Sequence, residues 1–324
     1  MPYSLLLRIL QQFNEMKIVF LDSDTMGDVS FAPIEQYGEL ICYGRSTPEE
    51  ALARVADCDI LIVNKVKVTP ELIDSAPSLK LICEAATGVN NIDLDYAAAK
   101  GIPVRNVAGY STDSVVQATF MHLLSLAGNA PYFDETVKNG SYSQSGIFTD
   151  ATQNWMELSG KVMGIIGMGA IGRKVAHVAE AFGMDVCYYS TSGTSHCSDY
   201  PSLPLERLLA EADVVSIHAP LNERTAGLIG KEELALMKSS AFLLNLGRGG
   251  IVDEGALAEA ADNGTIAGAA LDVFATEPLA SDSPLLHVAH PQRLRLAPHV
   301  AWASVEARDR LLHMIAANIK EFIS

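Results

Sequence analysis

Three side chains, an arginine, a glutamate and a histidine, have the types and spacing of a site for acid–base chemistry on an anionic substrate. Arg248 lies in N-L-G-R-G, Glu277 in D-V-F-A-T-E-P and His299 in P-H-V-A-W, which separates them by 29 and 22 positions. Each motif follows an apolar run that predicts a strand, and the carboxyl ends of strands in an open α/β sheet face one crevice. A guanidinium binds a carboxylate through a planar fork of donors, and an imidazole transfers protons near neutral pH. Combined with a hydride carrier, this set would interconvert hydroxy acids and keto acids.

Each of the three residues also has an ordinary structural explanation. His299 after Pro298 could be a histidine that ends a strand, Arg248 a solvated loop cation and Glu277 an exposed turn acid. Because all three explanations would have to hold together, we favour the catalytic interpretation. Other histidines, including His177, His196, His287 and His313, are expected at surface or helix positions without a role, and no spacing typical of a metal site occurs.

A hydride carrier has an expected site in the middle of the chain. Residues 161–172 read K-V-M-G-I-I-G-M-G-A-I-G, an apolar strand that runs into G-x-G-x-x-G and a helical segment. Gly167 is expected to make the turn, Gly169 to let the backbone approach pyrophosphate, and Gly172 to let the helix pack on the strand. The first turn of the helix presents free N–H groups to the anion. The sequence therefore predicts a dinucleotide site.

The elements that must position these residues alternate between strands and helices, in two series. The first series has predicted strands at 17–21, 60–63, 79–84 and 104–106, with helices near 48–56 and 70–76. The second has strands at 162–166, 186–189, 214–218, 241–245, 267–272 and 294–297, with a helix at 171–182. Such alternation is typical of parallel sheets. We expect an α/β protein with two Rossmann-like, doubly wound parallel-sheet domains.

The outer domain is expected to be discontinuous and to contain both chain termini, because a terminal helix at 305–323 lies beyond the last strand of the second series. The predicted bounds are 1–117 with 298–324 for the substrate domain and 118–297 for the dinucleotide-binding domain. One long helix, from Ser114 to Lys138, is expected to connect them. Residues 1–15 are expected to be a leader or an upstream extension, with Met16 as the alternative start.

Composition limits the partners. The 324 residues are 49% hydrophobic and 19% charged, and the net charge is −16, so nucleic acid and anionic membranes are not expected as partners. The apolar runs are too short to span a membrane. Five widely spaced cysteines predict buried free thiols in a reducing compartment, hence a cytoplasmic location.

Beyond G-M-G-A-I-G, four ordered motifs resemble the D-isomer-specific 2-hydroxyacid dehydrogenase family, and the resemblance covers roughly residues 16–324. They are H-A-P-L-N with Thr225, N-L-G-R-G, D-V-F-A-T-E-P and P-H-V-A-W-A-S-V-E-A-R. The resemblance implies reversible hydride transfer between C4 of a nicotinamide and C2 of a small 2-keto or 2-hydroxy acid. It also implies that Arg248 binds the substrate carboxylate, that His299 is the acid/base and that Glu277 orients His299.

The glycine motif and the resemblance together predict the binding residues. Those expected at the cofactor are Gly167, Met168, Gly169, Ala170, Ile171, Gly172, Ser190, Thr191, His218, Ala219, Pro220, Asn222, Thr225, Leu246, Gly247, Arg248, Asp272 and His299. Those expected at the substrate are Asn64, Lys65, Thr87, Gly88, Val89, Arg248, His299 and Trp302. Asp272 is implied to hold the carboxamide end of the nicotinamide.

Two positions depart from the family pattern. The acidic residue that usually accepts hydrogen bonds from the adenosine ribose is replaced by Ser190, followed by Thr191-Ser192-Gly193. This removes the carboxylate that repels a 2′-phosphate, yet the segment lacks the arginine that usually attracts one. NAD is therefore only slightly favoured over NADP. The other departure is Gln117, where many relatives carry glutamate.

Trp302 and the run A-S-V-E-A-R most resemble bacterial glycerate dehydrogenases, also called hydroxypyruvate reductases. Hydroxypyruvate with D-glycerate is the expected substrate pair, and glyoxylate and other small 2-keto acids stay open. The alternative is a nucleotide-sensing interaction protein, similar to the transcriptional corepressors that share this fold. Homodimers are implied by the family, with the apolar and aromatic stretch 142–155 as the expected contact arm.

Overall fold

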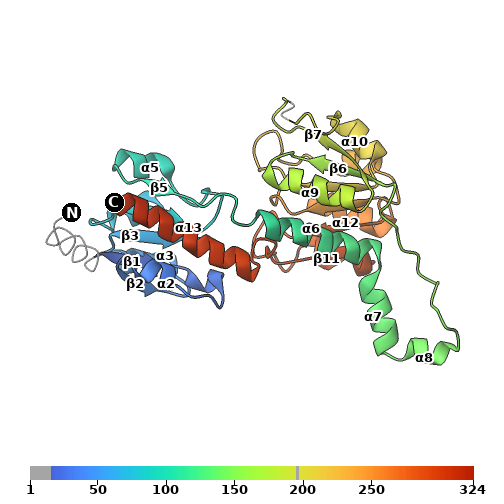
Figure 1. Cartoon of the computed structure of the whole chain (residues 1–324), viewed down its shortest axis with the longest axis horizontal. Coiled ribbons are helices and arrows are strands. Elements are labelled where there is room, and N and C mark those ends of the chain that lie inside the picture. Colours follow the sequence, from blue (N-terminus) through green and yellow to red (C-terminus); the bar gives the residue numbers. More distant parts are fainter. Residues whose placement is uncertain (1–15, 195–196) are drawn as a thin grey trace. The chain divides into compact units, whose positions relative to one another are not determined.

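The computed structural model describes residues 16–194 and 197–324, so the expected leader over residues 1–15 lies outside the described part. The chain divides into two compact units (Figure 1). Unit 1 runs to Ser111 and resumes over Ala303–Ser324, and unit 2 is Thr112–Trp302. The discontinuous outer unit built from both ends of the chain is therefore as expected.

The unit boundaries differ from the predicted ones by five or six residues. The first lies at 111/112 instead of the predicted 117/118, and the second at 302/303 instead of the predicted 297/298. The first difference arises because helix α6 (Thr112–Ala127) packs as a whole on α9 and on β9 to β11 of unit 2. The second arises because backbone N–H groups after His299 bind Asp272 of unit 2. His299 and Trp302 thus belong to unit 2 and not to the predicted substrate domain.

Unit 1 contains a five-stranded parallel sheet in the order β2-β1-β3-β4-β5. Its strands are β1 Lys17–Phe20, β2 Glu39–Cys42, β3 Ile60–Val63, β4 Leu81–Glu84 and β5 Val104–Arg105. β3 and β4 are buried at every position, as expected for parallel strands covered on both faces. The edge strand β2, which the sequence analysis missed, is short and partly exposed.

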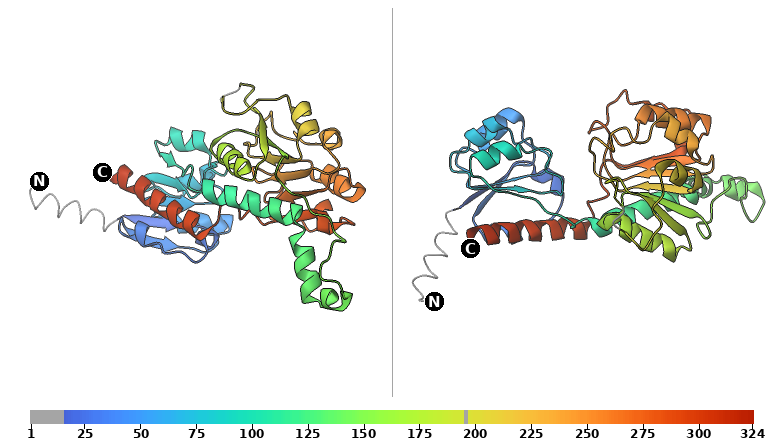
Figure 2. Two further views of the ribbon diagram at one scale, coloured as in Figure 1. Left: turned by 45° about the vertical axis from the view of Figure 1, so that its right-hand side comes forward. Right: turned by 90° about the horizontal axis from the view of Figure 1, so that it is seen from above.

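Helices cover both faces of the unit 1 sheet (Figure 2). They are α2 Ala32–Glu35, α3 Pro48–Arg54, α4 Pro70–Asp74, α5 Leu94–Ala99 and α13 Val305–Ile323, and a 3-10 turn η1 spans Ser23–Met26. α13 packs on α2 and β4, and α4 lies between α3 and α5. Capping explains where two of them begin, because Thr47 forms a capping box with Glu50, and Thr69 accepts from the N–H of Leu72.

Unit 2 contains a six-stranded parallel sheet in the order β11-β10-β9-β8-β6-β7. The strands are β6 Val162–Ile166, β7 Asp185–Tyr189, β8 Val214–Ile217, β9 Phe242–Asn245, β10 Gly268–Leu271 and β11 Leu294–Leu296. The helices are α6 to α8, α9 Ala170–Ala181, α10 Leu205–Glu211, α11 Lys231–Leu236 and α12 Glu254–Asn263, with 3-10 turns η2 Pro284–Leu286 and η3 Pro291–Arg293. One apolar core joins the sheet to α6 and α9, and a second joins it to α10, α11 and α12.

The long connecting helix expected over residues 114–138 is two helices, α6 and α7 (Ala130–Lys138). Gly128 and Asn129 separate them, and Asn129 adopts a left-handed φ of 47°. Pro131 then occupies the first turn of α7, where a missing N–H costs nothing. The sequence predicted a single helix because the apolar periodicity continues on both sides of this break.

All five cysteines are free; Cys58, Cys83, Cys187 and Cys197 are buried, and Cys42 is exposed, contrary to expectation. Burial raises the pKa of the Cys58 and Cys83 thiols to about 12, so both stay protonated. Within the described residues, no cluster of potential metal ligands occurs, and no helix is both long and apolar enough to cross a bilayer.

Candidate active site

The glycine loop after β6 has the geometry that a bound pyrophosphate needs. Gly167 has a φ of 96°, and a Cβ there would lie 2.9 Å from the carbonyl oxygen of His218. At Gly172, a Cβ would lie 2.3 Å from the carbonyl oxygen of Gly167. Gly169 has open space where its Cβ would be, directly before the first residue of α9. Backbone can therefore approach an anion at the start of this 12-residue helix, so the residues present fit a dinucleotide.

The segment after β8 forms a fixed turn beside the glycine loop. The Thr225 hydroxyl is fully buried, donates to the carbonyl oxygen of Pro220 at 2.6 Å and accepts from the N–H of Asn222 at 2.8 Å. The His218 ring lies 2.8 Å from the Ser216 hydroxyl, and burial lowers the His218 pKa to about 4. His218 is therefore neutral at physiological pH. Thr225 therefore stabilises this turn by hydrogen bonds within the chain itself.

Arg248 follows β9 in a turn that the preceding residues hold. The Asn245 amide donates to the Arg248 carbonyl oxygen at 2.9 Å, and its oxygen accepts from the N–H of Gly247 at 3.1 Å. The guanidinium donates only to the Gly247 carbonyl oxygen among the contacts of the described residues, at 2.9 Å. No carboxylate within the described part of the chain pairs with it, so the guanidinium keeps donors for an anionic ligand.

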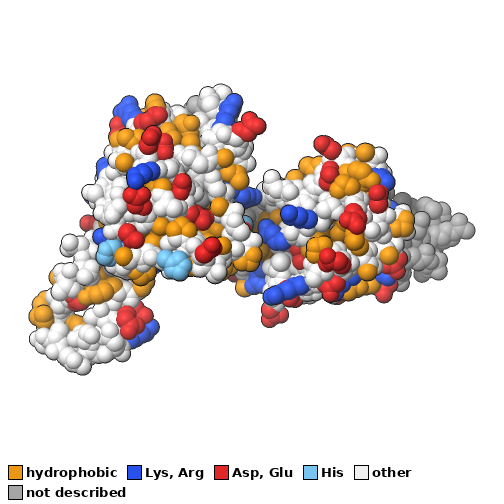
Figure 3. Space-filling model, turned by 180° about the vertical axis from the view of Figure 1, so that it is seen from behind, with side chains coloured by type: hydrophobic (Ala, Val, Ile, Leu, Met, Phe, Trp, Pro, Cys, Tyr) orange, Lys and Arg blue, Asp and Glu red, His pale blue; other side chains and the backbone are white. Residues whose placement is uncertain are grey.

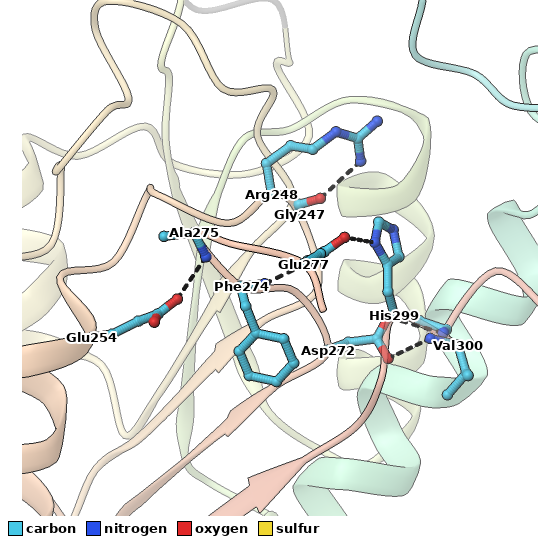
Figure 4. A network of polar contacts seen from close by, with 10 residues as sticks. Gly247, Arg248, Glu254, Asp272, Phe274, Ala275, Glu277, His299 and Val300 are labelled. Atoms are coloured by element: carbon cyan, nitrogen blue, oxygen red, sulfur yellow. Dashed lines mark hydrogen bonds and ion pairs between the residues drawn. The ribbon is translucent and has the colours of Figure 1, made fainter. Parts of the chain in front are cut away.

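His299 and Glu277, for which the sequence predicts an acid–base role, lie within hydrogen-bonding distance of each other (Figure 4). Nδ1 of His299 lies 2.7 Å from Oε2 of Glu277, and both side chains are partly exposed, at 26% and 33%. The other carboxylate oxygen of Glu277 accepts from the N–H of Phe274 at 3.0 Å, which fixes the carboxylate. His299 has a left-handed φ of 54°, a costly conformation for a residue with a side chain. The carboxylate holds the ring by Nδ1, so Nε2 points away from Glu277.

Asp272 fixes the backbone that follows the histidine. Its two oxygens accept the N–H groups of Val300 and Ala301, each at 2.9 Å (Figure 4). Burial raises the Asp272 pKa, and these two hydrogen bonds work against that rise. Asp272 thus has partners in the chain, and its implied contact with a nicotinamide stays a prediction. Trp302 lies partly buried three positions after His299 and ends unit 2.

The predicted substrate residues of unit 1 follow the neighbouring strands β3 and β4, so they meet at one edge of the sheet. Asn64 and Lys65 come after β3, and their N–H groups donate to the carboxylate of Asp22 at 2.6 to 3.2 Å. The loop from Thr87 to Val89 comes after β4 and is held by the Thr87 hydroxyl, which donates to the Val107 carbonyl oxygen at 3.0 Å. The structure therefore brings these residues together within unit 1.

Sequence reasoning missed the polar residues beneath those loops. Glu84 ends β4 and is fully buried, and its Oε2 accepts from the Asn91 amide at 2.9 Å. The same amide nitrogen donates to the Val66 carbonyl oxygen at 3.0 Å, which joins the two loops. Burial raises the Glu84 pKa to about 8, against the hydrogen bond from Asn91. A carboxylate directly after an apolar run was the signal available, at Glu84 after residues 81–83 and at Asp22 after residues 18–21.

Comparisons with known proteins agree with this geometry. Residues 120–301 match the family model described as D-isomer specific 2-hydroxyacid dehydrogenase, NAD binding domain. A hydroxypyruvate reductase of Blautia hydrogenotrophica is 35% identical over 95% of this chain and 97% of its own, and a glycerate dehydrogenase of Methylorubrum extorquens is 36% identical over 95% and 96%.

Among solved structures, the NADPH-dependent glyoxylate/hydroxypyruvate reductase of Sinorhizobium meliloti, in complex with NADP and malonate, superposes with a TM-score of 0.78. It is 28% identical, and the match covers 95% of this chain and 94% of that chain. The glycine loop of unit 2 is thus part of an NAD-binding domain, and the protein is an oxidoreductase that binds a nicotinamide dinucleotide. The chain belongs to the D-isomer-specific 2-hydroxyacid dehydrogenase family.

Proposed function

We propose that this protein interconverts hydroxypyruvate and D-glycerate by reversible hydride transfer at C2 of the substrate. The observation that carries the proposal is the Glu277–His299 pair, whose Nε2 points away from the carboxylate, on the same sheet edge as Arg248 and the glycine loop. A nicotinamide bound at that loop supplies the hydride donor or acceptor. The residues of the chain bind the substrate, orient it and move one proton.

Each of the three residues has a separate task. Arg248 binds the substrate carboxylate through its unpaired donors. His299 donates a proton from Nε2 to the carbonyl oxygen during reduction and takes it back during oxidation. Glu277 keeps Nδ1 protonated and stabilises the positive charge of the ring before the proton leaves. In unit 1, the side chains of Asn64 and Lys65 and the backbone of the loop 87–89 bind substrate, since the N–H groups of residues 64 and 65 already donate to Asp22.

The choice of hydroxypyruvate rests on relatives similar over nearly their whole length, a hydroxypyruvate reductase and a glycerate dehydrogenase. Glyoxylate is the second substrate to test, because the Sinorhizobium enzyme reduces both. The corepressor-like interpretation is not favoured, because these relatives are named as dehydrogenases and reductases.

The experiment is to measure the initial rates of NADH and NADPH oxidation by the purified protein with hydroxypyruvate, glyoxylate and pyruvate at equal concentration. We expect hydroxypyruvate to give the highest kcat/KM. A clearly higher value for either of the other acids would contradict the substrate assignment and leave the reaction class intact. No oxidation with any of them, by a protein that binds the cofactor, would contradict the proposed reaction.

We further propose that the protein is a cytoplasmic homodimer. The free cysteines support the reducing compartment.

The segment α7 to residue 155, which includes α8 (Ser141–Ser145), supports the dimer because its apolar side chains are exposed: Val137 59%, Ile147 63%, Phe148 89% and Trp155 65% (Figure 3). Sedimentation of the wild type and of Phe148→Asp should give a dimer and a monomer, respectively, and a monomeric wild type would contradict this.

A further inference from the structure

The loop after β7 lies where dinucleotide-binding sheets read the adenosine ribose, and here it is rich in hydroxyl groups. β7 pairs with β6, so its carboxyl end lies next to the glycine loop. The Ser190 hydroxyl donates to the Thr194 carbonyl oxygen at 2.6 Å and lies 3.1 Å from the Ser192 hydroxyl. These contacts make a compact turn with no carboxylate in it. Where a carboxylate would repel a 2′-phosphate, this loop therefore has only hydroxyl side chains.

A cation reaches this turn from a different loop. Arg224 follows β8, 32 positions after Ser192, and its Nη1 donates to the Ser192 carbonyl oxygen at 2.5 Å. A Cβ on Gly193 would lie 3.3 Å from the same nitrogen, so the guanidinium lies against the backbone of residues 192–193. The Arg224 N–H donates to the side chain of Asn222 at 2.9 Å, which holds the loop. The arginine missing from the β7 loop is thus supplied from the β8 loop.

The two loops line an open surface cavity of about 370 Å³, formed by Thr191, Ser192, Asn222, Glu223 and Arg224. No carboxylate within residues 16–194 and 197–324 lies within ion-pairing distance of Arg224, so its charge is not neutralised there. Glu223 also lines the cavity and would oppose an anion. The cavity therefore offers the Arg224 guanidinium and the Thr191 hydroxyl against one carboxylate, together with the Ser192 hydroxyl, which donates to the Thr194 carbonyl oxygen at 3.0 Å and would have to turn from it to reach a ligand.

We propose that Arg224, with the hydroxyls of Thr191 and Ser192, binds the 2′-phosphate of NADP(H), and that the protein prefers NADP(H) to NAD(H). A guanidinium binds phosphate through charge-assisted, bidentate hydrogen bonds, and hydroxyls add donors of adjustable direction. NAD(H) has a ribose hydroxyl there, and the β7 loop lacks the carboxylate that usually accepts its hydrogen bond. The proposal rests on the cofactor site of the proposed function, because it assumes a dinucleotide at the glycine loop.

The test is direct binding of NADPH and NADH to the full chain, followed by cofactor fluorescence and by calorimetry. For the wild type we expect NADPH to bind at least about tenfold more tightly. Arg224→Ala should weaken NADPH binding about ten- to a hundredfold and leave NADH within twofold. Arg207→Ala is the matched control, since it removes another exposed guanidinium of unit 2, one that pairs with Glu211, and should change neither affinity.

Two further variants act in opposite directions on the same cavity. Glu223→Gln should strengthen NADPH binding, because it removes the opposing charge. Ser190→Asp should weaken NADPH binding and strengthen NADH binding. Equal wild-type affinities, or an Arg224→Ala variant that weakens both cofactors equally or neither, would overturn the proposal while leaving the dehydrogenase function standing. A wild type that binds neither cofactor would overturn both.

Discussion

Both units use a buried aspartate at a strand end to fix the loop after the neighbouring strand. In unit 1, Asp22 follows β1 and accepts from the N–H groups of residues 64–66, after β3, at 2.6 to 3.2 Å. In unit 2, Asp272 follows β10 and accepts from Val300 and Ala301, after β11, both at 2.9 Å. A carboxylate acceptor makes such hydrogen bonds strong, so each aspartate fixes its loop.

What lies beside the fixed loop differs between the units. In unit 2 it is His299, partly exposed and paired with Glu277. In unit 1 it is Glu84, fully buried, with one oxygen bound by Asn91 and the other without a partner. An aspartate of the same kind thus lies beside a partly exposed, hydrogen-bonded histidine–glutamate pair in one unit and beside a buried glutamate that supports backbone loops in the other. We infer that unit 2 carries the acid–base residues of the proposed reaction. Unit 1 fixes the conformation of the loops proposed to bind substrate.

The largest expected effect comes from removing the chemistry of unit 2. His299→Ala should lower kcat about 10²- to 10⁴-fold, because no other group donates the proton. Arg248→Ala should instead raise KM for the keto acid strongly. Both variants should still bind the reduced cofactor, since the glycine loop is unchanged, and cofactor fluorescence measures this binding. His177→Ala is the control, since His177 has Glu180 at 3.7 Å but lies exposed on α9. Full activity in either active-site variant would contradict the assignment of that residue.

Removing the anchor of unit 1 is expected to have the next largest effect. Asp22→Ala leaves the buried N–H of Asn64 and the partly buried N–H groups of residues 65 and 66 without this acceptor, at a cost of about 3 kcal/mol. Amide hydrogen exchange by mass spectrometry should then show loss of protection at residues 64–66 and unchanged protection in β6 to β11. Asp22→Asn keeps one acceptor oxygen and should lose less. Unchanged exchange in Asp22→Ala would mean that the aspartate does not hold the loop.

Much of this architecture could be predicted from the sequence because it depends on local signals. Apolar runs of buried parallel strands predicted β3 at its observed bounds, and amphipathic periodicity predicted α13 in the same way. The glycine spacing gave the correct turn, strand and helix. Edge strand β2 was missed because its residues are partly exposed and lack a continuous apolar run.

The features that could not be predicted depend on residues far apart in the chain. Ser192 and Arg224 meet only because β7 and β8 both pair with β6, and no spacing rule places the tips of those loops. The Glu84–Asn91 contact joins residues only seven positions apart, but it depends on how the loop after β4 folds back. The acid–base pair was predictable because its motifs identified both residues, whereas its 2.7 Å separation required the fold.

A smaller effect should come from the buried carboxyl of unit 1, through pH. Burial raises the Glu84 pKa from 4.5 to about 8. Between these values the folded protein holds a proton that the unfolded chain has lost, so this group makes stability fall as pH rises. From pH 5 to pH 7 the fall is about 2 to 3 kcal/mol. Glu84→Gln, which stays neutral, should lose less stability over this range in urea unfolding, and Glu71→Gln, an exposed control, should behave as the wild type. Parallel curves for all three would contradict a neutral Glu84.

The smallest predicted effect tests the Glu277–His299 pair, the feature by which unit 2 differs from unit 1. Glu277→Gln keeps the size of the side chain and a hydrogen bond to His299 Nδ1 but removes the charge that stabilises the protonated ring. We expect kcat to fall about tenfold, less than in His299→Ala, with KM for the keto acid within about twofold. Proton transfer would then limit the rate, so a solvent deuterium isotope effect on kcat should grow in Glu277→Gln. A variant that raises KM and leaves kcat unchanged would mean that Glu277 shapes the substrate site, as Glu84 does in unit 1, and that the contrast between the two edges does not hold.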